Sequence, residues 1–382
     1  MTTRRLLHCL LAAISCLLLA EAPARAEDGV SPSEVRVGMV NAQSGPAAGL
    51  GFGMLAGAKA YFARVNAAGG VHGRQIRLIS RDDGYEPART AAQTEALIHT
   101  DQVFALLGYV GTPTSRAAMP IAMAAQVPYL FPFTGADFLR TPAKPWVFNI
   151  RASYFDETEE LVERMTEDLG VSKIALLMQD DSFGESVKGG LAGALHKRGM
   201  QIQAEARIQR NSLEVADAVH SLQLHQPDAI VFVGTYRQLA AAIKQAKASG
   251  MAARFLTVSF IGTDNFITAA GPDGDGVYIT QVVPAPHDAS VAVVDRYLHD
   301  IRPADIGYTS LEGYLGAMIF VQALRQAGAQ PTRVKLTSAL EALHSDLGGF
   351  KVAFSPTDHQ GSDAVFLTRI QGGKAIPVDK MY

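Results

Sequence analysis

The sequence predicts an α/β protein built from two doubly wound lobes. Short apolar strands alternate with amphipathic helices along the chain, and the alternation restarts after residue 150. Strands that are apolar along their whole length belong to parallel sheets whose two faces are covered by helices. Two such series therefore predict two sheets, each in its own lobe. The strand-rich tail, 350–376, is too short for a third domain and is expected to complete the two lobes.

Each series can be placed along the chain. In the first, strands are expected at 35–40, 75–81, 103–107, 128–131 and 146–150, with helices at 54–67, 87–99 and 113–125. In the second, strands are expected at 174–178, 202–206, 229–233 and 255–258, with helices at 185–198, 214–225 and 238–249. A strand at 277–283 then leads into three helix-like stretches. The chain must therefore cross between the lobes more than once.

The amino-terminal segment has the pattern of a secretory signal peptide. Arg4 and Arg5 precede an uncharged apolar run over residues 6–20, and an Ala-Arg-Ala cleavage sequence ends at Ala26. The run is shorter than the roughly 20 apolar residues that a membrane-spanning helix needs. We therefore expect residues 1–26 to be removed and the mature protein to reside in the periplasm.

Composition excludes several classes of site and partner. Both cysteines, Cys9 and Cys16, lie in the predicted signal peptide, so the mature chain would have no disulfide, catalytic thiol or thiolate metal site. The formal net charge is −3, and the chain has no basic run that would favour nucleic acid or anionic lipid. No later stretch is long and apolar enough to predict a transmembrane span.

Enzyme motifs are weak or missing. Residues 51–56 fit a dinucleotide fingerprint, but the segment 41–50 separates them from the preceding strand, where the fingerprint requires direct succession. No G-x-S-x-G elbow and no H-E-x-x-H motif occurs, and the histidines are scattered. We therefore predict no catalytic residue, no cofactor and no metal.

The sharpest local signal is Thr112-Pro113, which predicts a helix whose amino-terminal cap is Thr112. The exposed N–H groups of such a helix can hold a carboxylate, although a purely structural cap has the same sequence. This cap follows a strand, and open α/β sheets bind ligands at the carboxyl ends of their strands. Aromatic residues follow several strands in the same way and could line one cleft, namely Tyr109, Phe131, Phe133, Phe183 and Tyr236.

An ordered set of motifs resembles the type I periplasmic binding proteins of ABC transporters, and within them the leucine/isoleucine/valine-binding group. The matching motifs include Val35-Arg36-Val37-Gly38, Ser44-Gly45-Pro46, Asp82-Asp83, Phe183-Gly184, Glu312-Gly313-Tyr314 and the segment Asn-Ala-Ala-Gly-Gly-Val-His-Gly-Arg at 66–74. Together they span nearly the whole mature chain. The resemblance implies two Rossmann-like lobes joined by a three-strand hinge, closing on a ligand like a Venus flytrap. It divides the chain into 27–150 plus 282–347 for one lobe and 151–281 plus 348–382 for the other.

The resemblance also implies a ligand site between the lobes. Its predicted residues are Thr112, Phe133, Thr134, Phe183, Tyr236 and Ser259, with Ser44 and Tyr109 at the cleft mouth. Thr112 would hold the ligand carboxylate, and the aromatic residues would form wall and lid. Amino-acid binders of this group carry an acid at the position of Ser259. Either Asp264 or another acid therefore replaces it, or the ligand lacks an ammonium group.

The predicted function is the periplasmic substrate-binding component of an ABC transporter, acting as a monomer with a membrane permease as its partner. Its ligand would be a small carboxylate-bearing solute, and a branched-chain amino acid is the first expectation. The alternatives are an aromatic or aliphatic carboxylic acid or amide as ligand, or a ligand-sensing input module for a signalling receptor.

Overall fold

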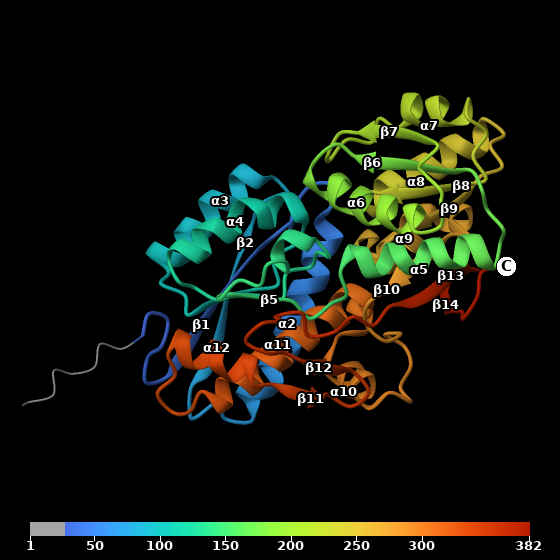
Figure 1. The fold of residues 1–382 in the computed structure, drawn as a ribbon. Coiled ribbons are helices and arrows are strands. Elements are labelled where there is room, and N and C mark those ends of the chain that lie inside the picture. Colours follow the sequence, from blue (N-terminus) through green and yellow to red (C-terminus); the bar gives the residue numbers. More distant parts are fainter. Residues whose placement is uncertain (1–26) are drawn as a thin grey trace, which may run out of the picture.

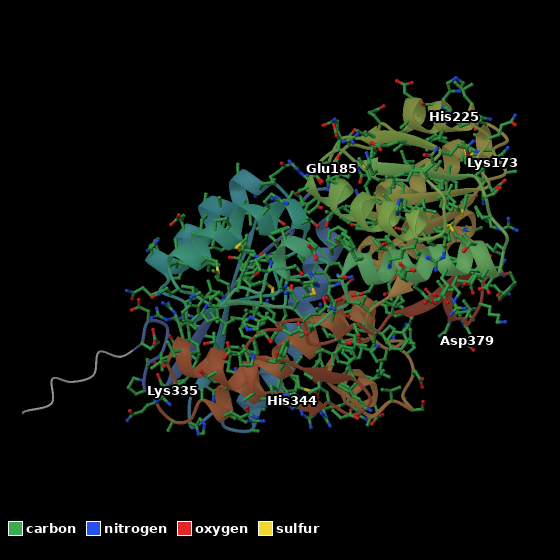
Figure 2. The ribbon with its side chains drawn as sticks, in the orientation of Figure 1. Lys173, Glu185, His225, Lys335, His344 and Asp379 are labelled. Atoms are coloured by element: carbon green, nitrogen blue, oxygen red, sulfur yellow. The ribbon has the colours of Figure 1, made fainter. Side chains whose placement is uncertain are left out.

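The computed structural model describes residues 27–382, and the predicted signal peptide with both cysteines lies outside them. The α/β prediction is confirmed, because two lobes lie beside each other, each with a sheet of mainly parallel strands between helices (Figure 1). Figure 2 shows Lys335 and His344 on the first lobe, and Lys173 and His225 at the far end of the second.

The first lobe contains a five-stranded parallel sheet in the order β2–β1–β3–β4–β5. Its strands are β1 (Glu34–Asn41), β2 (Gln75–Asp82), β3 (Ala105–Leu107), β4 (Tyr129–Leu130) and β5 (Val147–Phe148). The helices packed with it are α2 (Ala48–Ala67), α3 (Pro87–Glu95), α4 (Thr112–Ala124), α10 (Ala292–Asp300), α11 (Tyr308–Gln326) and α12 (Arg333–Glu341). The predicted helix at 87–99 ends its α-helical part at Glu95 and continues as a π-helical turn, Ala96–Thr100.

The second lobe contains a seven-stranded sheet in the order β14–β13–β10–β9–β8–β6–β7. Its strands are β6 (Ile174–Gln179), β7 (Ala204–Ile208), β8 (Ala229–Val233), β9 (Arg254–Thr257), β10 (Tyr278–Gln281), β13 (Phe366–Gln371) and β14 (Lys374–Pro377). Its helices are α5 (Tyr154–Glu167), α6 (Ser182–His196), α7 (Ala216–Gln223), α8 (Tyr236–Ala248) and α9 (Thr263–Ala270). β13 runs antiparallel to β10, and the strands from β6 to β10 are parallel.

The two sheets repeat one topology. In each sheet, the second strand of the series lies on one side of the first strand. The third, fourth and fifth strands follow in order on its other side. This order reverses the direction of winding between the first and third strands, and ligands of open α/β sheets bind beyond the carboxyl ends there.

The chain passes between the lobes three times, after β5, after β10 and before β13. The first and third passages lie side by side, because Asn149 N–H donates to His359 C=O at 2.9 Å and Gly361 N–H donates to Asn149 C=O at 2.7 Å. The hairpin of β11 (His344–Asp346) and β12 (Lys351–Ala353) spans the expected boundary at residue 347. It packs with first-lobe residues through Phe350, Val352 and Phe354.

Candidate functional site

The predicted ligand residues follow strands of both sheets. Thr112 and Phe133 follow β3 and β4 of the first lobe, and Phe183, Tyr236 and Ser259 follow β6, β8 and β9 of the second. All five are buried, with exposed fractions of at most 6%. The carboxyl ends of both sheets thus contribute to the region where the lobes meet.

Three hydroxyl groups form a cluster at the first-lobe side of this region. The Thr112 and Thr134 hydroxyls lie 2.7 Å apart, and Thr134 Oγ1 donates to Tyr154 Oη at 3.2 Å. Burial raises the pKa of Tyr154 to about 12, so its hydroxyl stays neutral. The cluster offers neutral donors of the kind that can bind a carboxylate.

The prediction that Thr112 caps α4 is wrong. The cap is Gly111, at φ 105°, and the Thr112 hydroxyl is bonded to Thr134 instead. A side chain on Gly111 would collide with the Tyr85 ring, so glycine alone fits this helix start. The Thr112 hydroxyl is consequently directed toward the neighbouring loop and leaves the helix N–H groups uncapped.

An aromatic cluster joins the two lobes. The Phe260 ring lies 4.5 Å from the Phe183 ring and 5.4 Å from the Phe133 ring, measured between centroids. The Tyr85 ring lies 6.1 Å from that of Phe260, and the Tyr154 ring 5.4 Å from that of Phe183. Phe133 and Tyr85 come from the first lobe and the other three rings from the second, so the cluster forms an apolar wall shared by both.

A fully buried cation lies beside this wall. Arg151 follows β5 at the first passage between the lobes, and its guanidinium lies 4.7 Å above the Phe133 ring. Its Nη2 is 3.6 Å from Glu157 Oε1 and contacts Ser259 Oγ, and its Nη1 is 3.7 Å from Glu312 Oε1. Because Glu157 is on α5 and Glu312 on α11, this ionic triad of Arg151, Glu157 and Glu312 bridges the lobes.

The two carboxylates of the triad differ in their surroundings. Glu157 Oε2 accepts the Ser259 N–H at 2.7 Å and the Thr280 hydroxyl at 2.6 Å. Burial raises the pKa of Glu312 to about 7, against the opposing effect of Arg151. The pKa of Arg151 is raised although burial lowers it, because Glu312 and Glu157 together outweigh the desolvation.

Further polar contacts join the two lobes. Tyr236 Oη accepts the Gly49 N–H at 3.2 Å. Arg210 Nη2 lies 3.0 Å from Glu86 Oε2, and Asn211 Nδ2 donates to Glu86 Oε1 at 2.7 Å. We call the group of Glu86, Arg210 and Asn211 the latch.

The two residues predicted at the cleft mouth lie apart from these clusters. The Ser44 hydroxyl is exposed and donates to Asp82 Oδ2 at 2.6 Å, which is one of the bonds that lower the pKa of Asp82 to about 2 against the effect of burial. The Tyr109 ring packs on Tyr129 at 4.9 Å, and its hydroxyl is bonded to Thr94 at 3.1 Å. Both are therefore held by first-lobe partners.

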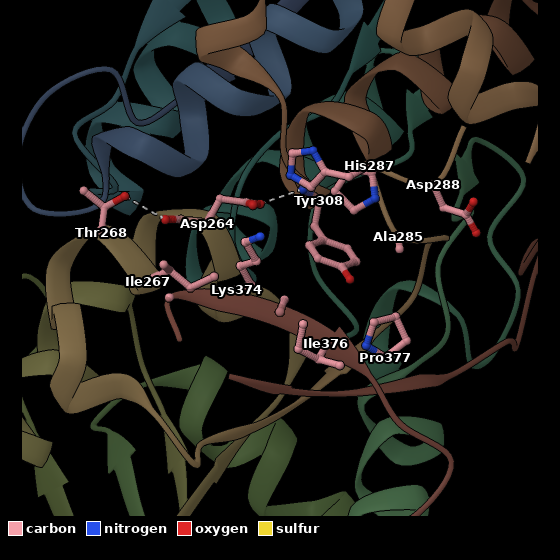
Figure 3. A pocket seen from close by; sticks show the side chains of 13 residues that line it. Asp264, Ile267, Thr268, Ala285, His287, Asp288, Tyr308, Lys374, Ile376 and Pro377 are labelled. Atoms are coloured by element: carbon pink, nitrogen blue, oxygen red, sulfur yellow. Dashed lines mark hydrogen bonds between the residues drawn. The ribbon is translucent and has the colours of Figure 1, made fainter. Parts of the chain in front are cut away.

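Asp264, the acid expected to replace the one missing at Ser259, lies in a different place. It lines a cavity of about 690 Å³ together with Tyr308, His287 and Lys374 (Figure 3), and none of the predicted ligand residues lines that cavity. Asp264 Oδ2 accepts the Tyr308 N–H at 2.8 Å, at the start of α11. Asp264 thus holds a helix terminus in place.

Sequence reasoning missed Arg151, Glu157, Glu312 and Phe260. One available signal was Glu312, which is the only acid in an otherwise largely apolar helix, α11. A carboxylate on a helix that is buried on all sides requires a buried partner. The partner, Arg151, has no local pattern that marks it, because the passage after β5 brings it to the cleft only in the folded chain.

Two classes of structure are absent from the described residues. Nowhere between residues 27 and 382 do three or more His, Cys, Asp or Glu side chains group as ligands for a metal ion. None of the helices in this range combines the length and hydrophobicity of a membrane span.

Solved structures and curated proteins resemble this chain. A possible leucine/isoleucine/valine-binding protein from Rhodopirellula baltica SH 1 is 34% identical, with a TM-score of 0.86 over 93% of this chain and 98% of that one. The Leu/Ile/Val-binding protein of Escherichia coli K12 is 20% identical over 65% of this chain and 67% of its own length. An amino acid binding protein of Pseudomonas aeruginosa is 22% identical, and the match spans 63% of this chain and 64% of that protein, just under two thirds.

These relatives are solute-binding proteins and not enzymes, and they confirm the resemblance seen in the sequence motifs. The two-lobed fold and the repeated sheet order agree with them. A family model for periplasmic binding proteins matches residues 34–375, and the chain therefore belongs to the periplasmic binding protein family.

Proposed function

We propose that this protein captures a small carboxylate-bearing solute between its lobes, in the periplasm, and delivers it to the membrane permease of an ABC transporter. The observation that carries the proposal is the hydroxyl cluster of Thr112, Thr134 and Tyr154 beside an aromatic wall built from both lobes. Neutral donors above an apolar wall suit a ligand with one carboxylate and a hydrophobic body. Removal of residues 1–26 and action as a monomer belong to the same proposal.

Two ligand classes compete within this function. The printed names of the Escherichia coli and Rhodopirellula baltica relatives favour a branched-chain amino acid. The serine at position 259 favours a carboxylic acid without an ammonium group, because no carboxylate side chain stands at that position. Both classes share the carboxylate that the hydroxyl cluster would bind.

A thermal-shift screen of residues 27–382 tests the function. The panel holds leucine, isoleucine, valine, aliphatic and aromatic monocarboxylic acids, and their amides. A ligand that binds only the folded state adds about 2.7 kcal/mol of stability at a hundred times its Kd. A panel without any stabilising compound would contradict the proposal.

The role of Thr112 is tested by Thr112→Ala. We expect its affinity for the best panel ligand to fall about tenfold, since one hydrogen bond to a charged group contributes about 1.5 kcal/mol. Thr337→Ala is the matched control, because Thr337 is also a buried hydroxyl of the first lobe but bonds only to its own helix backbone. Equal affinities of the two variants would remove Thr112 from the site.

A further inference from the structure

We propose that Arg151 determines ligand specificity: its guanidinium occupies the position where a ligand ammonium would lie, so the cleft selects apolar monocarboxylates that lack an ammonium group. This inference rests on the proposed function and narrows its substrate class.

The position of Arg151 links it to the predicted ligand residues of both lobes. Its Nη2 contacts Ser259 Oγ on the second lobe, and its guanidinium lies 4.7 Å from the centre of the first-lobe Phe133 ring. Its side chain has no exposed surface. Arg151 therefore lies beside Ser259, which stands at the position where amino-acid binders of this group carry an acid.

The acids that could pair with a ligand ammonium already face this cation. Glu157 Oε1 and Glu312 Oε1 lie 3.6 and 3.7 Å from the Arg151 guanidinium nitrogens. Glu157 also receives two hydrogen bonds from Ser259 and Thr280 through its other oxygen. A ligand ammonium placed here would meet Arg151 as a like charge in a dry region, which is unfavourable.

The guanidinium retains donors for a ligand. Among residues 27–382, Nε and Nη1 of Arg151 are buried and have no hydrogen-bond partner, and the contact of Nη1 with Glu312 Oε1, at 3.7 Å, is longer than a hydrogen bond. Buried donors without partners are costly, and a planar guanidinium matches a carboxylate in geometry and charge. Arg151 can thus offer these donors to the same carboxylate that the hydroxyl cluster would bind.

The charges around Arg151 favour an anion over a cation. Arg140 is a second buried arginine, and its guanidinium donates to the backbone carbonyls of Thr134, Ala136 and Arg151. Burial favours the neutral form of Glu312. The guanidinium groups of Arg151 and Arg140 therefore lie near two carboxylates, of which Glu157 accepts two hydrogen bonds through Oε2 and Glu312 is shifted by burial toward its neutral form.

The wild-type protein gives the first test, by calorimetry with matched ligand pairs. The pairs are 4-methylpentanoate with leucine, and 3-phenylpropanoate with phenylalanine, which differ only in the ammonium group. We expect at least one acid to bind ten or more times as tightly as its amino-acid partner. Binding of the amino acids as tight as that of the acids, or tighter, would overturn the role of Arg151 while leaving the proposed function intact.

Variants give the second test. Arg151→Met combined with Glu312→Gln removes one cation and one acid together, and Arg151→Lys keeps the positive charge without the planar fork. We expect the preference for the acid over its amino acid to fall at least tenfold in the double variant. Arg333→Met is the control, since Arg333 is a mostly buried arginine that donates to first-lobe carbonyls of Val103 and Phe104.

The outcomes separate the two proposals. An unchanged preference in a folded double variant, judged by its circular dichroism, would overturn the inference about Arg151. If the double variant does not fold, the inference is tested instead by the preference of the wild type and of Arg151→Lys for the acid over its amino acid. A wild-type protein that binds neither acids, amino acids nor amides would refute the proposed function, and the inference would fall with it.

Discussion

Removing the Glu86 carboxylate should weaken ligand binding by loosening the closed arrangement of the lobes. Glu86 belongs to the first lobe, and it receives Arg210 at 3.0 Å and Asn211 at 2.7 Å from the second. The closed conformation of a two-lobed binding protein is stabilised relative to the open one by the ligand and by every direct contact between the lobes. The perturbation is Glu86→Ala, which removes both contacts of the latch at once.

The expected loss of affinity is worked out from the solvent exposure of Glu86. The Glu86 side chain is 42% exposed, so its ion pair with Arg210 is screened by solvent and contributes about 0.5 kcal/mol. The Asn211 hydrogen bond contributes about 1 kcal/mol, less than a buried bond to a charged group, because solvent competes for this partly exposed carboxylate. The sum, about 1–2 kcal/mol, corresponds to a loss of affinity of about 5- to 30-fold.

The assay is calorimetric titration with the best ligand of the thermal-shift panel, at low and high salt. The control is Glu185→Ala, because Glu185 is an exposed acid that pairs with Arg207 at 2.7 Å within the second lobe (Figure 2). The Glu86 effect should also shrink at high salt. Equal affinities of the two variants would refute the assignment of the latch to closure.

Three other perturbations have defined outcomes. The pKa of Glu312 is about 7 in the fold and 4.5 ordinarily, so its contribution to the free energy of unfolding is present below pH 4.5 and lost as pH rises through 7, by up to about 3 kcal/mol. Urea unfolding at pH 5 and pH 8 should show this loss in the wild type, and Glu312→Gln should flatten it. Tyr236→Phe removes the hydroxyl bonded to Gly49 N–H and should lower ligand affinity about fivefold in calorimetry, whereas unchanged affinity would exclude that bond from closure. Phe260→Ala should lower the free energy of unfolding by about 3–5 kcal/mol, because the ring is fully buried, and a loss below 1 kcal/mol would contradict its place in the wall.

The sequence was sufficient for the fold because its signals are local and repeated. Apolar strands such as Ala229–Val233 and amphipathic helices such as Tyr236–Ala248 can be recognised from their own residue patterns. It is not necessary to know which elements they pack against. The errors lie at element ends. At Thr112, a typical cap residue was preceded by a glycine whose left-handed backbone begins the helix.

The site was less predictable because its polar contacts join distant segments. The Arg151 contact with Ser259, the Glu312 ion pair and the packing of Phe260 on Phe133 each depend on how the lobes meet. Strand ends indicated where Thr112 and Phe183 would lie, since that rule depends on topology alone. No comparable rule places a side chain that follows an inter-lobe passage.

The threefold passage between the lobes has a consequence for biogenesis. Helix α2 ends at Ala67, yet α11, which packs against it, begins only at Tyr308. The first lobe thus has no complete core until most of the chain has been synthesised, and contacts so distant in sequence form slowly. A chain that delays its own compaction stays unfolded for longer, and this would suit the export that we propose for it.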